Sequence, residues 1–531
     1  MAALDQIALG IVWGRVIGLL DEASATLVRI SFSTLVRESN DFSIVLTDAR
    51  GNALAQASAS LGSFVGTLPA TVRHFLALFP PETLEPGDVL VTNDPWLGTG
   101  HLPDVSIVKP IFHAGRLVAF SASTAHAPDI GGKIRSVEPR EVFEEGLQIP
   151  PMKLLSRGAI DATLERIIRK NVRTPDLTMG DLMAQVKVNE LVERRVSALI
   201  EEYALEDFTG FARQVQEASE RAMRAAIRRL PNGTYHAETF TDGLADPVRL
   251  QAAVIVRDDE VLVDYAGSHP QVDRALNVVP IFTYSYTAYT LKCVLLPHAA
   301  NNDGCFRPIR TTAPEGSILN PRFPAAVGAR MLVGHYIPFL VLQALAGVVP
   351  ERVIAAAGSP LWSINYNGVM PGGARCVGQF FLNGGYGASA GRDGYSTLSF
   401  PANASNTPVE MIERIGPLRV AAKALVPGSG GAGRYRGGLG QRVVLQSRSP
   451  ERLSILFVAE RTKTPAPGLA GGEAGAAGSV WINGKAVDPT VSHVLAPGDE
   501  VTIQTPGGGG YGPPDQRDPR LVARDREHGY V

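Results

Sequence analysis

Two short turns carry the side chains of this sequence that are best suited to chemistry. The first, Asn-Asp-Pro-Trp-Leu-Gly-Thr-Gly-His-Leu-Pro-Asp over residues 93–104, places His101 and Asp104 three residues apart in a turn rich in Gly and Pro. The second, Ala-His-Ala-Pro-Asp-Ile-Gly-Gly over residues 125–132, contributes His126 and Asp129. Two imidazoles with carboxylates suit a divalent metal ion such as Zn²⁺, Mn²⁺ or Fe²⁺, with coordination positions left open for water.

The segment between the two turns is predicted to bring them together. Residues 105–120 run out and back as a strand hairpin, so His126 returns to the end of the sheet where His101 and Asp104 lie. Asp41, at the start of an earlier predicted strand, is an acidic candidate for a fourth ligand. Spacing alone leaves a second interpretation open, in which the histidines are solvated turn residues and the aspartates cap turns.

Hydrophobic periodicity predicts the elements that position these turns. Residues 5 to about 36 have helical spacing, and at Asp41 the pattern changes to the alternation of a strand hairpin. Residues 159–230 are charge-rich with heptad-like spacing, and Pro231-Asn232-Gly233 ends them. Because strands stand before and after helices without regular βαβ alternation, the predicted class is α+β. We expect mixed sheets, a helical block in the first half and a β-rich, Gly-rich C-terminal region.

The same patterns divide the chain into regions. These are a metal-binding N-terminal region at 1–158, a helical block at 159–230, a mixed α/β region at 231–409 and a β-rich C-terminal region at 410–531. Residues 250–268 predict a hairpin that turns at Arg257-Asp258-Asp259, and residues 325–357 are expected to be mostly helical. From residue 410 onward the chain is expected to be β-like and loaded with glycine.

Composition limits the class of protein. The 531 residues carry 50 Lys and Arg against 52 Asp and Glu, a formal net charge of −2, and only 19% of residues are charged. A nucleic-acid-binding protein would need a basic excess for phosphate contacts, which argues against that class. The 55 Gly and 38 Pro stand between apolar runs with 19 Phe and 13 Tyr interleaved, as in a turn-rich globular protein. Sparse charge also indicates a surface that another chain covers.

Cysteine usage and hydropathy indicate the compartment. Cys293, Cys305 and Cys376 are odd in number and far apart, as expected of free thiols in a reducing cytoplasm. No run reaches the ~18 apolar residues of a membrane helix. The apolar N-terminal stretch lacks the basic region of a signal peptide, and Arg15 interrupts it. We therefore expect a soluble, cytoplasmic protein that does not bind membranes.

Three glycine-rich segments match known functional sequence motifs but lack the secondary structure that those motifs require. Residues 387–391 match GxSxG, but glycine on both sides of Ser389 leaves no helix to follow it, as a nucleophile elbow requires. Residues 428–433 and 507–512 match GxGxxG without a strand that leads into a helix. We interpret them as structural turns or as places where the backbone approaches the partner, and we expect no nucleotide site on this chain.

Separated blocks of the sequence, in order along nearly the whole chain, resemble the hydantoinase B family. They are NDPWLGTGHLPD (93–104), AHAPDIGG (125–132), EEGLQIPPMKLL (144–155), RPIRTTAPEGSILNPRFPAAVGAR (307–330), NTPVE (406–410), SGGAGRYRGGLGQ (429–441) and TPGGGGYG (505–512). That family includes the B subunit of ATP-dependent N-methylhydantoinases, the C-terminal half of 5-oxoprolinases, and subunits of the acetone and acetophenone carboxylases.

The resemblance implies a metal-bearing subunit that works with a separate hydantoinase A-type ATP-binding subunit. Carried over residue by residue, the family's metal site falls on Asp41, His101, Asp104 and His126, the set that the spacing also singles out. One divalent ion is expected there, with Zn²⁺ or Mn²⁺ as the first choices, while ATP is bound by the partner. Asp129 would orient a ligand histidine or act as the catalytic residue that carries protons.

The activity implied by the resemblance is ATP-dependent hydrolysis of a small cyclic amide such as a hydantoin, oxoproline or another lactam. Phosphorylation of the ring carbonyl oxygen in the partner subunit would make its carbon more electrophilic, and metal-activated water would then open the ring. Two alternatives remain: a subunit of an ATP-dependent ketone carboxylase, or a non-catalytic scaffold subunit whose metal is structural. A ligand set without cysteine favours an open site over a structural one.

Overall fold

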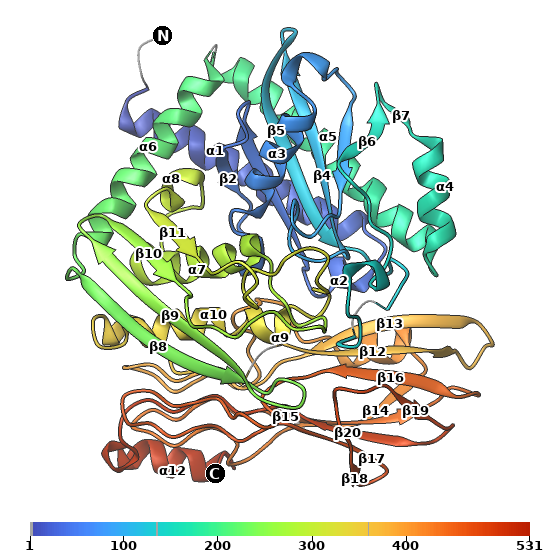
Figure 1. Ribbon diagram of the computed structural model, residues 1–531, viewed down its shortest axis with the longest axis vertical. Helices are drawn as coiled ribbons and strands as arrows, with labels where there is room; N and C mark the ends of the chain where they lie inside the picture. The colour runs from blue at the N-terminus through green and yellow to red at the C-terminus, as the bar shows by residue number, and fades with distance from the viewer. Residues whose placement is uncertain (1–3, 134–135, 206, 359–360) are drawn as a thin grey trace.

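The N-terminal part of the chain is organised around an antiparallel sheet of seven strands in the order β2-β1-β5-β4-β3-β6-β7 (Figure 1). The computed structural model describes residues 4–133, 136–205, 207–358 and 361–531. The strands are β1 Phe42–Asp48, β2 Ala53–Gln56, β3 Val89–Thr92, β4 Asp104–His113, β5 Arg116–His126, β6 Met152–Ser156 and β7 Ala159–Ile160. The hairpins predicted after Asp41 and over residues 105–120 are confirmed, because β1 pairs with β2 and β4 with β5.

Helices cover both faces of this sheet. Phe42 and Ile44 of β1 pack with helices α1 (Gln6–Ile30) and α5 (Pro175–Glu202) on one face. Val45 points to the other face and packs with α3 (Thr67–Leu78). Successive side chains of a strand point to opposite faces, so the alternating apolar residues of β1 bury both faces of the sheet. The ends of its strands stay free to carry polar side chains.

The predicted helical block is confirmed as α4 (Ala162–Asn171), α5 and α6 (Phe208–Ile227). The Asp161 carboxylate accepts from the first backbone N–H groups of α4, and Asp207 does the same for α6. On its buried face, α5 also makes polar contact with the sheet, where Ser121 donates to Asn189 at 2.7 Å. The block therefore packs on the sheet of its own chain.

A second sheet, in the order β11-β10-β9-β8, follows the helical block. Its strands are β8 Gly233–Thr241, β9 Val248–Arg257, β10 Glu260–Asp264 and β11 Ile309–Thr312. The predicted hairpin at 250–268 is confirmed by the pairing of β9 with β10. Helices α7 (Pro280–Leu295) and α10 (Ile337–Leu345) share an apolar core with this sheet, and two short helices, α8 (Asp303–Phe306) and α9 (Met331–Gly334), flank them.

The C-terminal part is a sandwich of two further sheets, in the lower half of Figure 1. One sheet has the order β13-β12-β16-β19, with β12 Trp362–Val369, β13 Arg375–Leu382, β16 Leu453–Val458 and β19 His493–Leu495. The other has the order β14-β15-β20-β17-β18, with β14 Leu418–Leu425, β15 Gln441–Ser447, β20 Glu500–Gln504, β17 Ser479–Ile482 and β18 Lys485–Ala486, and α11 (Val409–Ile415) precedes β14. Trp362 and Ile364 point into the core between the sheets, so Ser363 and Asn365 lie on the outer face of β12.

Glycine-rich segments run beside one another next to the sandwich and form what we call the glycine bundle, defined as residues 384–387, 429–440 and 506–512. Their backbones are bonded directly: Gly431 N donates to Gly508 O at 2.8 Å, and Gly508 N donates to Gly438 O at 2.9 Å. A Cβ atom on Gly437 would stand 1.9 Å from Gly508 O, so only glycine fits there. The GxGxxG stretches thus pack against other segments of the same chain, and an approach to a partner stays a prediction.

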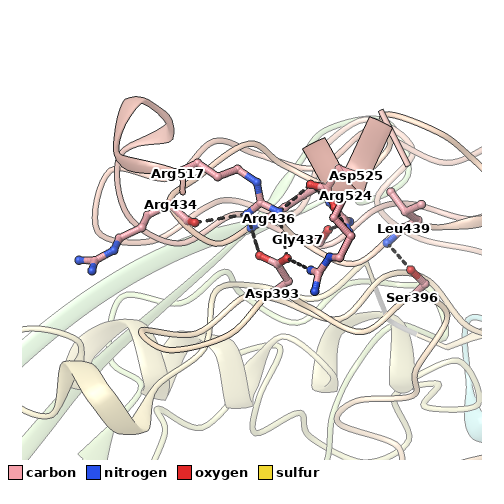
Figure 2. Close-up of polar contacts among 9 residues, drawn as sticks. All are labelled: Asp393, Ser396, Arg434, Arg436, Gly437, Leu439, Arg517, Arg524 and Asp525. Carbon is pink, nitrogen blue, oxygen red and sulfur yellow. Dashed lines mark hydrogen bonds and ion pairs between the residues drawn. The ribbon is translucent and has the colours of Figure 1, made fainter. Parts of the chain in front are cut away.

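A C-terminal helix, α12 (Pro519–Glu527), closes this end of the molecule (Figure 2). Its Asp525 is 1% exposed and accepts from Arg517 at 2.6 Å and from Arg436 of the glycine bundle at 3.2 Å. Asp393 receives two more bonds from Arg517, at 2.8 and 2.9 Å. The sequence interpretation of a β-like chain from residue 410 onward is therefore wrong for this segment. Asp518 at the helix start and Pro519 in its first turn favour a helix there.

These elements establish the α+β class predicted from the sequence, with helices beside mixed and antiparallel sheets. Within the described ranges, none of the helices combines the length and the apolar character needed to cross a membrane. Cys293, Cys305 and Cys376 are free thiols, as expected.

Candidate metal centre

Three strand ends of the seven-stranded sheet bring the predicted ligands together. Asp104 is the first residue of β4 and lies directly opposite His126, the last residue of β5. Asp41 immediately precedes β1, which is the other neighbour of β5, and the backbone N–H of His126 donates to Asp41 O at 3.1 Å. His101 lies in the turn that leads into β4. The out-and-back path predicted for residues 105–120 produces this arrangement.

One carboxylate oxygen lies between the two imidazoles. Asp104 Oδ1 is 2.9 Å from His101 Nε2 and 3.1 Å from His126 Nδ1. Ligand atoms of these three residues all lie within 4.8 Å of one another, and all three residues are buried. Asp41 stands at the edge of the group, with Oδ2 3.7 Å from His126 Nδ1. The structure thus gathers all four predicted ligands, three of them in tight contact.

The other oxygen of Asp104 is fixed by residues outside the cluster. Arg330 donates to Asp104 Oδ2 at 2.8 Å, and the hydroxyl of Thr99 donates to the same atom at 2.9 Å. Gly100 permits this contact, because a Cβ atom there would stand 2.9 Å from Arg330 Nε and its φ of +109° disfavours other residues. The guanidinium also lies 4.3 Å from the ring centroid of Phe282. Oδ1 is therefore left to face the histidines.

The backbone of Gly328 connects His101 to a buried glutamate. His101 Nδ1 lies 3.3 Å from Gly328 O, which leaves Nε2 directed at Asp104. Glu145 Oε1 accepts from the backbone N–H groups of Val327 and Gly328 at 2.7 and 2.6 Å. Glu145 therefore holds in place the loop whose carbonyl orients the imidazole.

Electrostatics favour a neutral His101 and an ionised Asp104. Burial, together with the neighbouring Arg330, lowers the pKa of His101 to about 4. Burial would raise the pKa of Asp104, but His101 and Arg330 outweigh burial and hold this pKa well below its usual value. A neutral imidazole beside an ionised carboxylate is ready to bind a cation without first losing a proton.

The cluster opens into a cavity of about 60 Å³ between the first sheet and the C-terminal sandwich. A cavity needs about 10–15 Å³ to hold one water by this measure, so there is room for an ion and the reacting edge of a small molecule. The walls combine the four predicted ligands and Arg330 with Ser63, Tyr286, His335, Gln379 and an apolar set, Leu61, Phe64, Phe282, Met331, Leu361, Phe381, Ala402 and Ala404. Burial and Arg330 lower the pKa of His335 to about 3, so this histidine is neutral as well.

Asp129 lies outside this cavity. Its carboxylate accepts from the Arg173 side chain at 2.8 Å and from Gly131 N at 3.1 Å. Asp129 and Arg173 instead line a second pocket of about 180 Å³ beside Asn365 and Asn367 of β12. The structure therefore separates Asp129 from the other four predicted site residues, and its catalytic role stays a prediction.

The donor set suits a divalent cation. Two carboxylates and two imidazoles, without a thiol, are ligands that Zn²⁺, Mn²⁺ and Fe²⁺ accept. The buried Nε2 atom of His126 has no hydrogen-bond partner among the described residues, which is costly for a polar atom unless a ligand or water meets it. None of the three cysteines lines the cavity. The arrangement can hold a cation while leaving one side open to a substrate.

Comparisons with known proteins identify the family. The Hydantoinase B/oxoprolinase family model matches residues 5–514, and the chain belongs to that family. A putative D-/L-hydantoinase B subunit from Pseudomonas sp. (strain NS671) is 31% identical, with 99% of this chain and 93% of that protein covered. The caprolactamase beta subunit of Pseudomonas jessenii is 28% identical, with 100% of this chain and 95% of that protein covered.

Solved structures share the fold. A chain of the ATP-dependent caprolactamase from Pseudomonas jessenii superposes with a TM-score of 0.90 at 25% identity, covering 99% of this chain and 94% of that chain. A chain of nucleotide-free acetone carboxylase superposes with a TM-score of 0.89 at 19% identity, covering 99% of this chain and 78% of that chain. The second likeness concerns the fold alone.

Sequence patterns did not single out several residues of the site. Arg330 stands at the end of the block 307–330, and an arginine within the apolar run Ala-Ala-Val-Gly-Ala-Arg-Met-Leu-Val was the available signal. Glu145 is the second residue of an equally visible block, 144–155, but its role depends on a loop far along the chain. Gln379 lies in β13 between Gly378 and three apolar residues, and nothing in this local pattern indicates that it faces the metal cavity.

Proposed function

We propose that this chain is the metal-bearing B subunit of an ATP-dependent hydrolase of cyclic amides. The observation that carries the proposal is the convergence of Asp41, His101, Asp104 and His126 in one buried cavity, in a chain of the Hydantoinase B/oxoprolinase family. Support for the substrate class comes from relatives named for hydantoinase, oxoprolinase and caprolactamase activities. The substrate would be a small ring whose carbonyl edge enters the cavity.

In this proposal, Asp41, His101, Asp104 and His126 hold one divalent ion. When bound, such an ion lowers the pKa of coordinated water toward neutrality and polarises carbonyl oxygens. The protein residues supply position and exclusion of bulk water. Arg330 and Thr99 fix Asp104, while Gly328 fixes His101. The apolar walls contributed by Phe64, Leu361 and Phe381 exclude bulk water from the ring.

The proposal includes a second subunit of the hydantoinase A type that binds ATP and activates the amide. Relatives that are named as B and beta subunits support a hetero-oligomer. The low charge of the chain, 19% of residues, and the exposed Ile7 and Ile11 of α1 are compatible with a surface that a partner covers. Activation by phosphorylation would take place in that partner, and ring opening at the cavity described above.

Metal analysis and variants test the metal site. We expect about one divalent ion per chain, lost on His101→Ala or Asp104→Ala and retained on His113→Ala. His113 lies at the opposite end of β4 and serves as the matched control. Full metal occupancy in both site variants would contradict the proposal.

Removal of the metal with a chelator distinguishes a catalytic metal from a structural one. Loss of activity without unfolding supports a catalytic metal, whereas unfolding supports a structural metal.

The reaction class is tested with the complete two-subunit complex. We expect ATP-dependent ring opening of a cyclic amide that needs no bicarbonate, and no turnover by this chain alone. Bicarbonate-dependent turnover of a ketone, with no ring opening, would instead identify a carboxylase component. Turnover of a cyclic amide by the isolated chain would contradict the two-subunit mechanism.

A further inference from the structure

One polar wall residue of the metal cavity has an unused hydrogen-bond acceptor. Gln379 is 7% exposed and lines the cavity together with Asp41, His101, Asp104 and His126. Its Oε1 atom is buried and has no hydrogen-bond partner among the described residues. Buried polar atoms are nearly always bonded, and exceptions in a binding cavity commonly await a ligand or water.

The strand register explains why Gln379 faces the cavity. Phe380 and Leu382 of β13 point into the core of the sandwich, so Gln379 and Phe381 point out of it and into the cavity. Gln379 pairs with Asn365 of the neighbouring strand β12. The side chain is therefore presented by a rigid sheet rather than by a loop.

A neighbouring serine sets which end of the carboxamide faces the cavity. The Gln379 amide group donates to Ser363 Oγ. Ser363 Oγ in turn lies 3.5 Å from Asn365 Oδ1, toward which its own proton is directed. With Nε2 committed in this way, Oε1 remains as an acceptor.

We infer that Gln379 is a specificity-determining residue whose Oε1 accepts the ring N–H of a cyclic amide. The inference rests on the proposed function. When the amide oxygen of a lactam or hydantoin is phosphorylated, the ring nitrogen keeps its N–H in the protonated imidate. The activated ring carbon can then face the His/Asp cluster while the N–H faces Gln379. A simple ketone brings acceptors only, and would leave Oε1 without a partner. A site that is built to bond an N–H rejects analogues that lack it more strongly than a purely apolar pocket rejects them.

The test compares lactams with lactones of the same ring size in the complete complex with ATP. A lactone replaces the N–H by an oxygen of similar size, so it keeps the shape and loses the donor. The ratio of kcat/KM for a five-, six- or seven-membered lactam to that for its lactone is measured for the wild-type protein and for Gln379→Met. Dividing the two ratios cancels the intrinsic reactivity of the lactone. We expect Gln379→Met to lower the lactam preference at least tenfold, with metal content unchanged.

Two further variants keep the inference falsifiable. Gln379→Glu retains an acceptor and is expected to keep more of the lactam preference than Gln379→Met. Ser363→Ala frees the carboxamide to turn and is expected to weaken the preference. An equal loss for lactam and lactone in Gln379→Met, or an unchanged ratio, would overturn the inference. If the wild-type complex opens neither a lactam nor a hydantoin, the proposed function fails instead, so the wild-type complex is measured before any variant.

Discussion

Arg330 and Asp104 are 226 residues apart in the sequence and form an ion pair of 2.8 Å inside the protein, with side-chain exposures of 5% and 1%. The arginine approaches from the start of α9, and the aspartate is the first residue of β4. This pair joins the middle of the chain to the strand end that carries the predicted ligands. It also supplies a cation to the cluster before any metal binds.

We expect Arg330→Met to destabilise the metal-free protein by about 3–5 kcal/mol, because it leaves the buried Asp104 carboxylate without its cation. Denaturant unfolding in the presence of chelator measures the effect. Adding Zn²⁺ or Mn²⁺ should stabilise this variant more than the wild-type protein, since the metal then provides the missing positive charge. Arg322→Met is the matched control: its ion pair with Glu315 is exposed and should contribute below about 1 kcal/mol. Equal stability of the two variants would contradict the role of Arg330.

Asp129→Asn distinguishes the two roles predicted for Asp129. Because its carboxylate is bound to Arg173 and lies outside the metal cavity, we expect metal retention and an unchanged shape of the pH–rate profile. Stability should fall by about 1–3 kcal/mol, since the buried bonds to Arg173 and Gly131 weaken. Activity and metal content of the complex are measured across pH. Loss of one limb of the profile, with kcat reduced about 10²–10⁴-fold, would assign proton transfer to Asp129.

Glu460 makes stability depend on pH. Burial, followed by the nearby Asp242, raises the pKa of Glu460 to about 8, above its unfolded value of 4.5. The folded state therefore holds a proton that the unfolded state releases between these values, and the stability from this group falls as pH rises from about 4.5 to 8. We expect the free energy of unfolding of Glu460→Gln to depend less on pH than that of the wild-type protein. At pH 8.5 the loss of stability should be smaller in the variant by on the order of 1–3 kcal/mol. Unfolding curves from pH 5.5 to 8.5 measure it, with the exposed Glu315→Gln as control; parallel curves for wild type and Glu460→Gln would refute the assignment.

Asp525 is expected to anchor α12 through Arg436 and Arg517 (Figure 2). Replacing it with Asn leaves Arg436 without a carboxylate partner in a buried position, and should cost about 3 kcal/mol. Glu527→Gln on the exposed side of the same helix should stay within about 0.5 kcal/mol. Urea unfolding measures both, and metal content should be unchanged because the network shares no residue with the metal cavity. An Asp525→Asn protein as stable as wild type would contradict the anchor.

The parts of the site that local sequence determines were predictable. The alternation of residues 105–120 predicts a hairpin, which brings Asp104 and His126 to the same end of the sheet. Their direct pairing also depends on an irregularity between Ile111 and Phe112 that shifts the register by one residue, and the sequence pattern did not predict it. The helical block and the strands on either side of it follow from periodicity in the same way.

The remaining parts depend on how distant segments pack. Arg330 reaches the cavity from the start of α9, and Gln379 reaches it from the outer face of the sandwich. No local sequence pattern indicates which other part of the protein packs against these two positions. The helix α12 was missed for a different reason. The helix is rich in charged residues and has no apolar face wide enough to predict it from periodicity. It is stabilised by ion pairs with the glycine bundle. Long-range packing, rather than propensity, decided these positions.

The glycine bundle has a consequence for how the protein is made. Residues 506–512 supply partners to both of the other segments: Gly508 bonds Gly431 and Gly438, and Pro506 O accepts from Gly385 N. A ribosome that has synthesised residues up to Thr505 therefore presents a row of backbone amides and carbonyls that have nothing yet to bind. This region must complete its folding after residues 506–512 have emerged, and the nascent chain has to be protected from aggregation until then.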